Sequence, residues 1–162
     1  MKYFFDTEFI ERPCTIDLIS IGVVCEDGRE LYCISNEFDE SKASQWVKDN
    51  VITKLGNHPR VTRGTIKNLL LAFVGEDKPE FWAYYADYDW VALCWLMGTM
   101  MELPDGWPMY CRDLKQWADT IECGDIPEFN TGDEHNALAD AKQNMKAYEW
   151  LRIFEIARKE QE

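Results

Sequence analysis

The first nine residues constrain the fold of this chain more than any other stretch. Aromatic side chains at positions 3–5 run directly into Asp6 and Glu8. The aromatic run predicts a buried strand over residues 2–6, and residues two apart on a strand share one face, so both acids can point the same way. Two carboxylates buried together lose water and repel each other. A divalent cation with oxygen ligands would offset that cost, so the pattern indicates a metal-binding pair.

An Asp-x-Glu pair is common in soluble proteins, so the rest of the chain has to support this interpretation. The 162 residues, 46% of them hydrophobic, are enough for one core, and we expect a single domain over residues 1–162. No run approaches the roughly 18 apolar residues of a membrane span, and the first apolar run stops too early for a signal peptide. The six cysteines form no Cys-x-x-Cys pair, which argues against a zinc ribbon or a disulfide framework. We therefore expect a cytoplasmic protein that does not bind membranes.

The net charge of −13 argues against binding nucleic acid through a broad basic surface. A nucleic-acid function would have to be local, with a short single-stranded end held at a metal centre. The alternative is that the acidic surface only keeps the protein soluble.

The order of the predicted elements indicates a mixed sheet. Strands over residues 15–25 and 30–35, joined by an Asp-Gly turn, continue the first strand as an antiparallel meander. In the segment that follows, Ala43, Trp46 and Val47 recur at the spacing of an apolar helix face. Strands first and alternating elements afterwards predict the α/β class, with a mixed central sheet and helices on both faces. The further predicted elements are helices over 41–50, 65–74, 90–101, 112–122 and 136–158 and strands over 80–85 and 109–111.

Two more acids, Asp87 and Asp89, lie between the strand over 80–85 and the helix over 90–101. Acids at the start of a helix often only cap it and interact with its dipole. Asp89 follows an aromatic residue and precedes a buried run, which favours an inward-facing position. We therefore prefer Asp89 as the functional acid, and Asp87 could assist or replace it.

The two histidines stand in different contexts. His58 precedes a proline in a polar loop and is expected at the surface. His135 ends a glycine-containing loop just before the last helix, where a histidine is often a cap or a surface residue. Asp140, five residues later, would not share a helix face with His135 if both were helical. With His135 in the loop, however, the loop can fold back over a rigid Asp140, which suits a mobile base beside a fixed metal ligand.

In this order, Asp6-x-Glu8, Asp89 and His135-x4-Asp140 resemble the three motifs of the DEDDh family of 3′–5′ exonucleases. That family includes the proofreading subunit of bacterial DNA polymerase III, RNase T and oligoribonuclease. The segments FFDTEF, AYYADYDW and EHNALADA, which are spread over nearly the whole chain, most resemble its poly(A)-directed RNase AS branch. The resemblance implies a ribonuclease H-like fold and, commonly, a homodimer.

The resemblance also implies roles for individual residues. The metal-binding acids would be Asp6, Glu8, Asp89 and Asp140, which would hold two Mg²⁺ ions, with Mn²⁺ as a substitute. Two such ions clamp the attacking and leaving oxygens of a phosphodiester. His135 would be the general base and would complete the catalytic set with the four acids.

Thr7 and Phe9, which flank Glu8, are predicted to contact the substrate. Phe9 could stack on the terminal base, and packing in the core would explain it equally well.

The predicted function is metal-dependent 3′–5′ hydrolysis of single-stranded RNA ends, adenylate-rich ones among them, to 5′-mononucleotides. A proofreading-type exodeoxyribonuclease is one alternative, because the same chemistry cuts DNA and the sequence does not show which sugar is recognised. A second is a non-catalytic module that binds nucleic-acid ends, and a third is an acidic interaction domain in which the motifs are coincidental.

Overall fold

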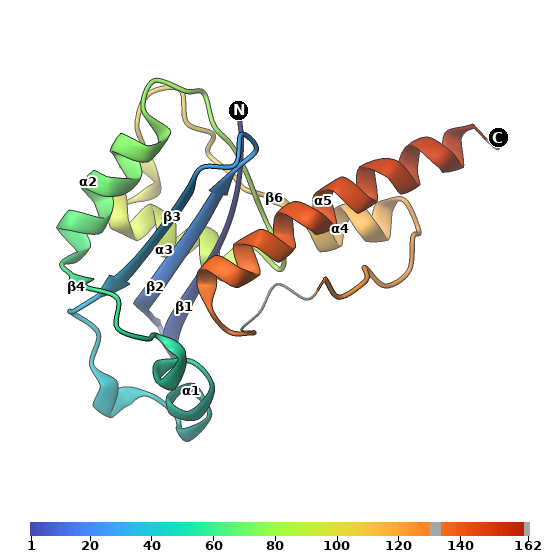
Figure 1. Cartoon of the computed structure of the whole chain (residues 1–162). Helices are drawn as coiled ribbons and strands as arrows, with labels where there is room; N and C mark the ends of the chain where they lie inside the picture. Colours follow the sequence, from blue (N-terminus) through green and yellow to red (C-terminus); the bar gives the residue numbers. More distant parts are fainter. Residues whose placement is uncertain (130–133, 161–162) are drawn as a thin grey trace.

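A six-stranded sheet in the order β4-β3-β2-β1-β5-β6 forms the centre of the computed structural model, which describes residues 1–129 and 134–160 (Figure 1). The first three strands form an antiparallel meander, and the other three each join their neighbour in parallel. The sheet is therefore mixed, as predicted. The strands are β1 (Lys2–Arg12), β2 (Thr15–Cys25), β3 (Glu30–Ser35), β4 (Arg60–Val61), β5 (Glu80–Ala83) and β6 (Arg112–Asp113).

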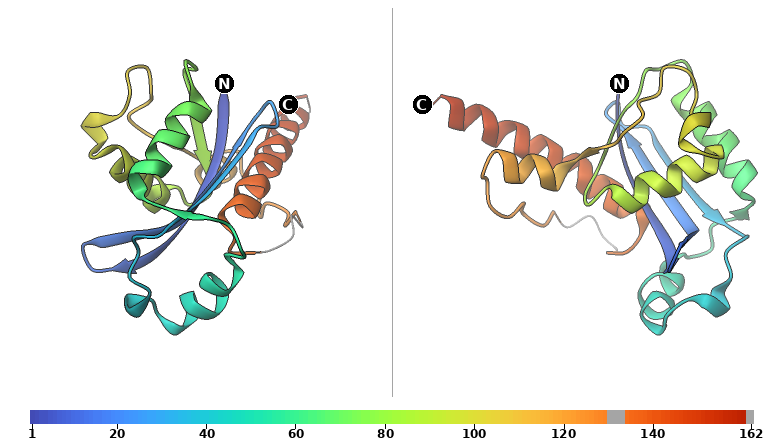
Figure 2. Two further views of the ribbon diagram at one scale, coloured as in Figure 1. Left: turned by 60° about the vertical axis from the view of Figure 1, so that its left-hand side comes forward. Right: turned by 180° about the vertical axis from the view of Figure 1, so that it is seen from behind.

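Helices cover both faces of the sheet, which confirms the predicted α/β class and is consistent with a ribonuclease H-like fold (Figures 1 and 2). α2 and α3 pack on one face, and α4 and α5 pack on the other. Within the described residues, no helix is long and apolar enough to cross a membrane. The helices are α1 (Gln45–Asn50), α2 (Arg63–Val74), α3 (Asp87–Met97), α4 (Leu114–Thr120) and α5 (Ala137–Lys159), with 3-10 turns η1 (Glu40–Lys42), η2 (Ile52–Lys54) and η3 (Met100–Glu102).

The aromatic start of β1 is buried because both of its faces are covered. Tyr3 and Phe5 lie in the core under α2 and α3, whereas Phe4 lies in the core under α4 and α5. Alternation along the strand then directs Asp6 and Glu8 to the α5 face. The strand that fills two cores thus also presents two carboxylates at the start of the last helix.

β1 is longer than the predicted strand over residues 2–6. It continues to Arg12 and pairs with β2 as far as Thr15, with a bulge between Glu8 and Phe9. Charged side chains in its second half hide the strand pattern, but the backbone ladder with β2 does not depend on them. The residues after Asp6 are therefore held in the sheet and do not form a loop.

The helix predicted over residues 41–50 is split into the end of the 3-10 turn η1 and the short helix α1, whose first turn is capped by Ser44. Ala43 is buried as expected, but Trp46 is 54% exposed. The prediction that Trp46 packs on an apolar helix face with Ala43 is wrong, because α1 starts after Ala43 and turns Trp46 outward.

Around α3 and α4, the bounds of the elements differ from the predicted bounds by a few residues. α3 begins at Asp87 and ends at Met97, so both acids of the second motif lie in its first turn. The strand expected over residues 109–111 is displaced to β6, where Arg112 pairs with Trp82 of β5. Asp113 then caps α4 by accepting a hydrogen bond from the Gln116 N–H at 2.8 Å.

One glycine sets how closely α5 approaches the sheet. Gly22 on β2 pairs with Asp6 on β1. A Cβ at Gly22 would lie 2.2 Å from the carbonyl oxygen of Ala137 and 2.4 Å from the nitrogen of Leu138, both in the first turn of α5. The missing side chain therefore allows the start of the last helix to lie against the strand directly beside Asp6.

Candidate active site

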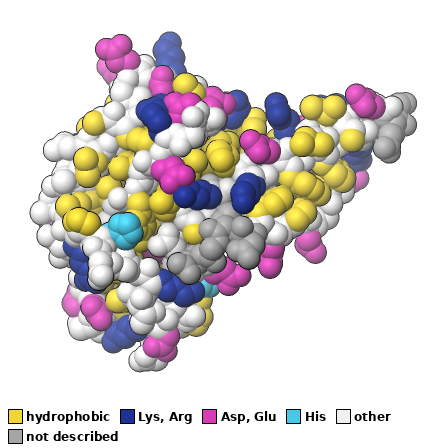
Figure 3. Space-filling model, in the orientation of Figure 1, with side chains coloured by type: hydrophobic (Ala, Val, Ile, Leu, Met, Phe, Trp, Pro, Cys, Tyr) yellow, Lys and Arg dark blue, Asp and Glu magenta, His cyan; other side chains and the backbone are white. Residues whose placement is uncertain are grey.

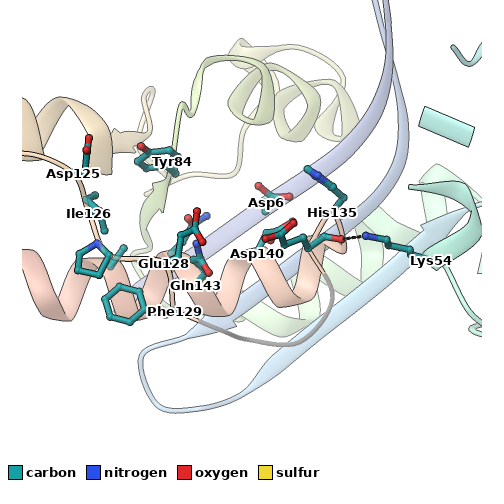
Figure 4. Close-up of a pocket in the computed structure, with 14 residues that line it drawn as sticks. Asp6, Lys54, Tyr84, Asp125, Ile126, Glu128, Phe129, His135, Asp140 and Gln143 are labelled. Carbon is teal, nitrogen blue, oxygen red and sulfur yellow. Dashed lines mark hydrogen bonds between the residues drawn. The ribbon is translucent and has the colours of Figure 1, made fainter. Parts of the chain in front are cut away.

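Asp6 and Glu8 on β1 belong to an acidic cluster with Asp89 and Asp140, and Asp6 lies beside Asp140 in the first turn of α5 (Figure 4). Removal from water raises the pKa of Asp6 well above its ordinary value, and the charges of Asp89, Glu8 and Asp140 raise it further. The pKa of Glu8 is raised to about 8 by burial and by Asp140 and Asp89, with Lys54 opposing the shift. Near neutral pH and without a cation, the cluster therefore keeps protons that ordinary carboxyl groups would lose.

Asp89 is the inward-facing acid of the second motif. It is 6% exposed, and its Oδ1 accepts hydrogen bonds from the backbone N–H of Thr7 at 2.8 Å and from its hydroxyl at 2.6 Å. Burial raises the pKa of Asp89 to about 6, although the bonds from Thr7 act in the opposite direction. Asp87 is exposed, so the structure agrees with the pattern that favoured Asp89 as the inward-facing residue.

The ladder between β1 and β5 explains why Asp89 can reach β1. That pairing extends only from Lys2 to Phe4. Farther along β1, the Thr7 N–H donates to a side chain of α3 and not to a neighbouring strand. The Asp89 carboxylate thus accepts the hydrogen bond that a neighbouring strand would accept if the ladder continued to Thr7.

Asp140 lies in the first turn of α5, and Asn136 caps that turn by accepting hydrogen bonds from two backbone N–H groups at 3.1 and 3.2 Å. The backbone N–H of His135 donates to the Asp140 carboxylate. Burial raises the pKa of Asp140, whereas its electrostatic interaction and hydrogen bond with His135 act in the opposite direction. One ligating atom each of Glu8, His135 and Asp140 lie within 4.8 Å of one another, so the fold brings the first and third motifs together.

His135 lies in the loop before α5, as predicted, and its backbone adopts a left-handed conformation with φ of 60°. Its ring meets the ring of Trp46 edge-on, with centroids 4.9 Å apart. The preceding carbonyl, that of Glu134, accepts a hydrogen bond from Lys54 Nζ at 2.8 Å (Figure 4). His58, in contrast, is exposed, as expected for a surface residue.

A cavity of about 960 Å³ opens at the acidic cluster and extends along α5 (Figure 4). Asp6, His135 and Asp140 line one end, and Tyr84 and Phe129 line the part farther along. A second cavity, of about 370 Å³, lies between β1 and α1. Asp6 and Asp140 are thus reachable from a space large enough for the end of a polymer.

The two predicted substrate contacts have different surroundings. The Thr7 side chain is buried and donates to Asp89, so it orients an acid. Phe9 is half-buried just past the bulge and lines the second cavity, with its ring 5.9 Å from that of Tyr88. Contact of either residue with a substrate stays a prediction.

Two residues beside the cluster, Trp46 and Lys54, were not predicted from the sequence. Trp46 fitted an apolar helix pattern, and Lys54 stood in a segment with no recognisable motif. Only the tertiary fold brings them to the loop before α5, so no local pattern could have identified them.

The donor set fits a hard divalent cation. Asp6, Glu8, Asp89 and Asp140 offer carboxylate oxygens, and the pKa of each is raised by loss of water and by repulsion from at least one neighbouring acid. Oxygen ligands of this kind suit Mg²⁺ or Mn²⁺ better than softer metals.

A mixed sheet with carboxylates on its first strand, facing a histidine just before its last helix, is typical of 3′–5′ exonucleases with a ribonuclease H-like fold. Comparison with known proteins agrees with this class. The chain belongs to the family described as the 3′-5′ exoribonuclease Rv2179c-like domain, whose model matches residues 1–151. Two curated Mycobacterium tuberculosis proteins, 3′-5′ exoribonuclease MT2234.1 (strain CDC 1551) and 3′-5′ exoribonuclease Rv2179c (strain H37Rv), are each 43% identical over 154 residues, which is 91% of this chain and of each relative.

The raised pKa values predict that the metal-free protein becomes less stable as the pH rises. Carboxyl groups in the unfolded chain lose their protons at about pH 4, whereas Glu8 in the folded protein does so at about 8. Across that window the folded state binds more protons, so its stability is lost with increasing pH. We expect the melting temperature in EDTA to fall between about pH 5 and pH 8, with excess Mg²⁺ removing most of the decrease.

Thermal melts across this pH range, with EDTA or Mg²⁺, measure the effect. Glu8→Gln is the matched control and should make the EDTA profile less steep, because the amide does not titrate whereas the other three acids still do. A wild-type profile in EDTA as flat as that of Glu8→Gln would contradict the account of the cluster.

Proposed function

We propose that this protein is a 3′–5′ exoribonuclease that hydrolyses single-stranded RNA from its 3′ end and releases 5′-mononucleotides. The observation that carries the proposal is the gathering of four acids and one histidine from three distant segments, with Asp6, Asp140 and His135 at one end of an open cavity. The 43% identity to proteins named 3′-5′ exoribonuclease supports RNA as the substrate. With a net charge of −13, binding would depend on this local site and not on a broad basic surface.

Asp6, Glu8, Asp89 and Asp140 would hold two divalent ions, Mg²⁺ with Mn²⁺ as a substitute. The four positive charges of two divalent ions balance the four carboxylates, which accounts for a cluster that is otherwise costly to bury. When bound, the ions would supply Lewis-acid activation of water and of the scissile phosphate.

The remaining steps belong to the side chains of the protein itself. His135 would accept a proton from the attacking water as the water oxygen bonds to phosphorus. The bond from phosphorus to the 3′-oxygen of the penultimate nucleotide breaks, and that oxygen takes up a proton to become the new 3′ end. Thr7 orients Asp89, and the His135 backbone N–H orients Asp140. Phe9, beside Tyr88, would stack on the terminal base.

We further propose that residues 1–162 act as one exonuclease domain in the cytoplasm. The hydrophobic clusters pack around one sheet, and the family model matches residues 1–151. Six free cysteines suit a reducing compartment.

A homodimer is proposed through the far half of α5. This half extends beyond the sheet with α4 beside it (Figure 2). Ile153 and Ile156 are 63% and 52% exposed, and hydrophobic side chains are spread along this arm (Figure 3). An exposed apolar surface of this kind favours association.

Digestion of end-labelled substrates tests the function. Single-stranded poly(A), a second RNA homopolymer and single-stranded DNA, each labelled at the 5′ end, would be incubated with Mg²⁺, Mn²⁺ or EDTA. We expect stepwise shortening of RNA from the 3′ end, release of 5′-mononucleotides, faster cutting of poly(A) and no reaction in EDTA. The adenylate preference comes from the resemblance to poly(A)-directed enzymes.

An RNA blocked by a 3′-phosphate is the control for direction and should be cut far more slowly. Equal or faster digestion of DNA would favour the exodeoxyribonuclease alternative. Binding of RNA ends without any cleavage in either metal would favour a non-catalytic module.

A further inference from the structure

The segment from α1 to η2, residues 45–54, contacts the candidate site at two points. The Trp46 ring meets the His135 ring edge-on at 4.9 Å, with an interplanar angle of 74°. Lys54 Nζ donates a hydrogen bond to the Glu134 carbonyl oxygen at 2.8 Å (Figure 4). Both contacts therefore hold the same two consecutive loop residues, one through a side chain and one through the backbone.

His135 needs such support. Its φ of 60° lies in the left-handed region, where a non-glycine backbone is strained. The next residue, Asn136, is already fixed as the cap of α5. A half-buried imidazole on a strained backbone would adopt several orientations unless its neighbours selected one.

The supporting segment is itself well anchored. Val51 and Leu55, on either side of η2, are buried against the sheet residues Ile10, Ile19 and Ile34. The contacts to the loop therefore come from an element fixed to the sheet. The Trp46 side chain is 54% exposed, so burial in the core does not fix its position. Its edge-on contact with the His135 ring accounts for that position.

Lys54 adds a charge to the same place. Its ammonium group stabilises the ionised forms of Glu8 and Asp140, so it lowers the pKa of both carboxyl groups. Lys54 also lines the large cavity beside His135. It thus lies close enough to hold the loop and to offset part of the negative charge.

We infer that Trp46 and Lys54 are positioning residues of the proposed exonuclease reaction. They hold Glu134 and His135 so that the imidazole faces the acids and the attacking water. The inference rests on the proposed function. Neither residue touches the reacting atoms, so both should act through His135.

Steady-state kinetics on an RNA oligonucleotide provide the first test. Displacing a catalytic group by about 1 Å costs on the order of 100-fold in rate. We therefore expect Trp46→Ala and Lys54→Met each to lower kcat by about 10- to 100-fold while KM changes less than about 3-fold. Trp46→Phe should restore most of the rate, because the ring contact is retained.

A double-mutant cycle separates positioning from substrate binding. If Trp46 acts through His135, adding Trp46→Ala to His135→Ala should change kcat by less than about 2-fold. Multiplied effects, or a raised KM with an unchanged kcat, would show that Trp46 contacts RNA and would overturn the inference. Trp95→Ala, which removes a similarly exposed tryptophan (50%) from α3, is the matched control and should match the wild type.

Ring-proton NMR gives a readout that does not depend on activity. The chain has only two histidines, so each can be followed separately. Trp46→Ala should shift the His135 ring signals and leave those of His58 unchanged, because His58 packs on Tyr32. Unchanged His135 signals would overturn the inference even in an active enzyme. If Trp46→Ala shifts the His135 signals but the wild-type protein cuts no nucleic acid, the result would instead refute the proposed function.

Discussion

Asp6→Asn should abolish RNA hydrolysis and leave the metal-free protein at least as stable as the wild type. Asp6 has a pKa raised well above its ordinary value by loss of water and by three neighbouring acids. An amide keeps the size of the side chain but carries no charge, so it relieves repulsion and weakens metal binding together. Losing metal assistance, worth several kcal/mol, corresponds to a decrease of about 1,000-fold or more in kcat.

The two halves of this prediction are measured separately. Activity is followed on labelled RNA, and stability is followed by thermal melts in EDTA, where each 1 kcal/mol of relieved repulsion should raise the melting temperature by about 2–4 °C. Asp87→Asn is the matched control, because Asp87 is exposed in the same turn as Asp89, and it should retain near-wild-type activity. A large fall in the metal-free melting temperature of Asp6→Asn would argue against the acidic cluster.

Gly22→Ala should destabilise the protein by about 3 kcal/mol or more and lower its activity strongly. The added Cβ would lie 2.2 Å from a backbone oxygen of α5, and backbone atoms in a helix turn cannot move aside as a flexible side chain would. The helix start has to shift away from β2, which displaces Asp140 and His135 from Asp6. Both losses should therefore appear in the same variant.

Urea unfolding measures the loss of stability, and kcat on RNA measures the loss of activity that follows from displacing Asp140 and His135. Gly64→Ala is the control, since a Cβ there would meet only the Thr62 side chain, at 3.8 Å, within α2. This variant should be more stable than the wild type by about 0.5–1 kcal/mol, because alanine favours a helix over glycine. A Gly22→Ala protein with wild-type stability would show that α5 does not approach β2 so closely.

Features that depend on local chemistry could be predicted from the sequence. The β2–β3 hairpin follows from β-branched runs on either side of an Asp-Gly turn, and its strand bounds agree with the prediction. The inward position of Asp89 follows from its place between aromatic residues. The mixed sheet with helices on both faces follows from the order of elements.

Features that arise from tertiary contacts could not be predicted from the sequence. The second half of β1 is charged, and only its ladder with β2 makes it a strand. Trp46 and Lys54 reach the loop before α5 from a segment about 80 residues away in the chain. Gly22 did carry a signal, because a glycine inside a strand often marks a close backbone approach. The roles of the acids and of His135 in catalysis stay predictions.

The docking of α5 beside Asp6 also bears on how the enzyme is made. A ribosome adds Asp6 and Glu8 early, whereas Asp140 belongs to the last helix of the fold. A growing chain therefore lacks one of the four acids, and the histidine, until that helix is being synthesised. No fragment that stops before Asp140 can assemble the full set, so the proposed activity arises only after the preceding strands exist.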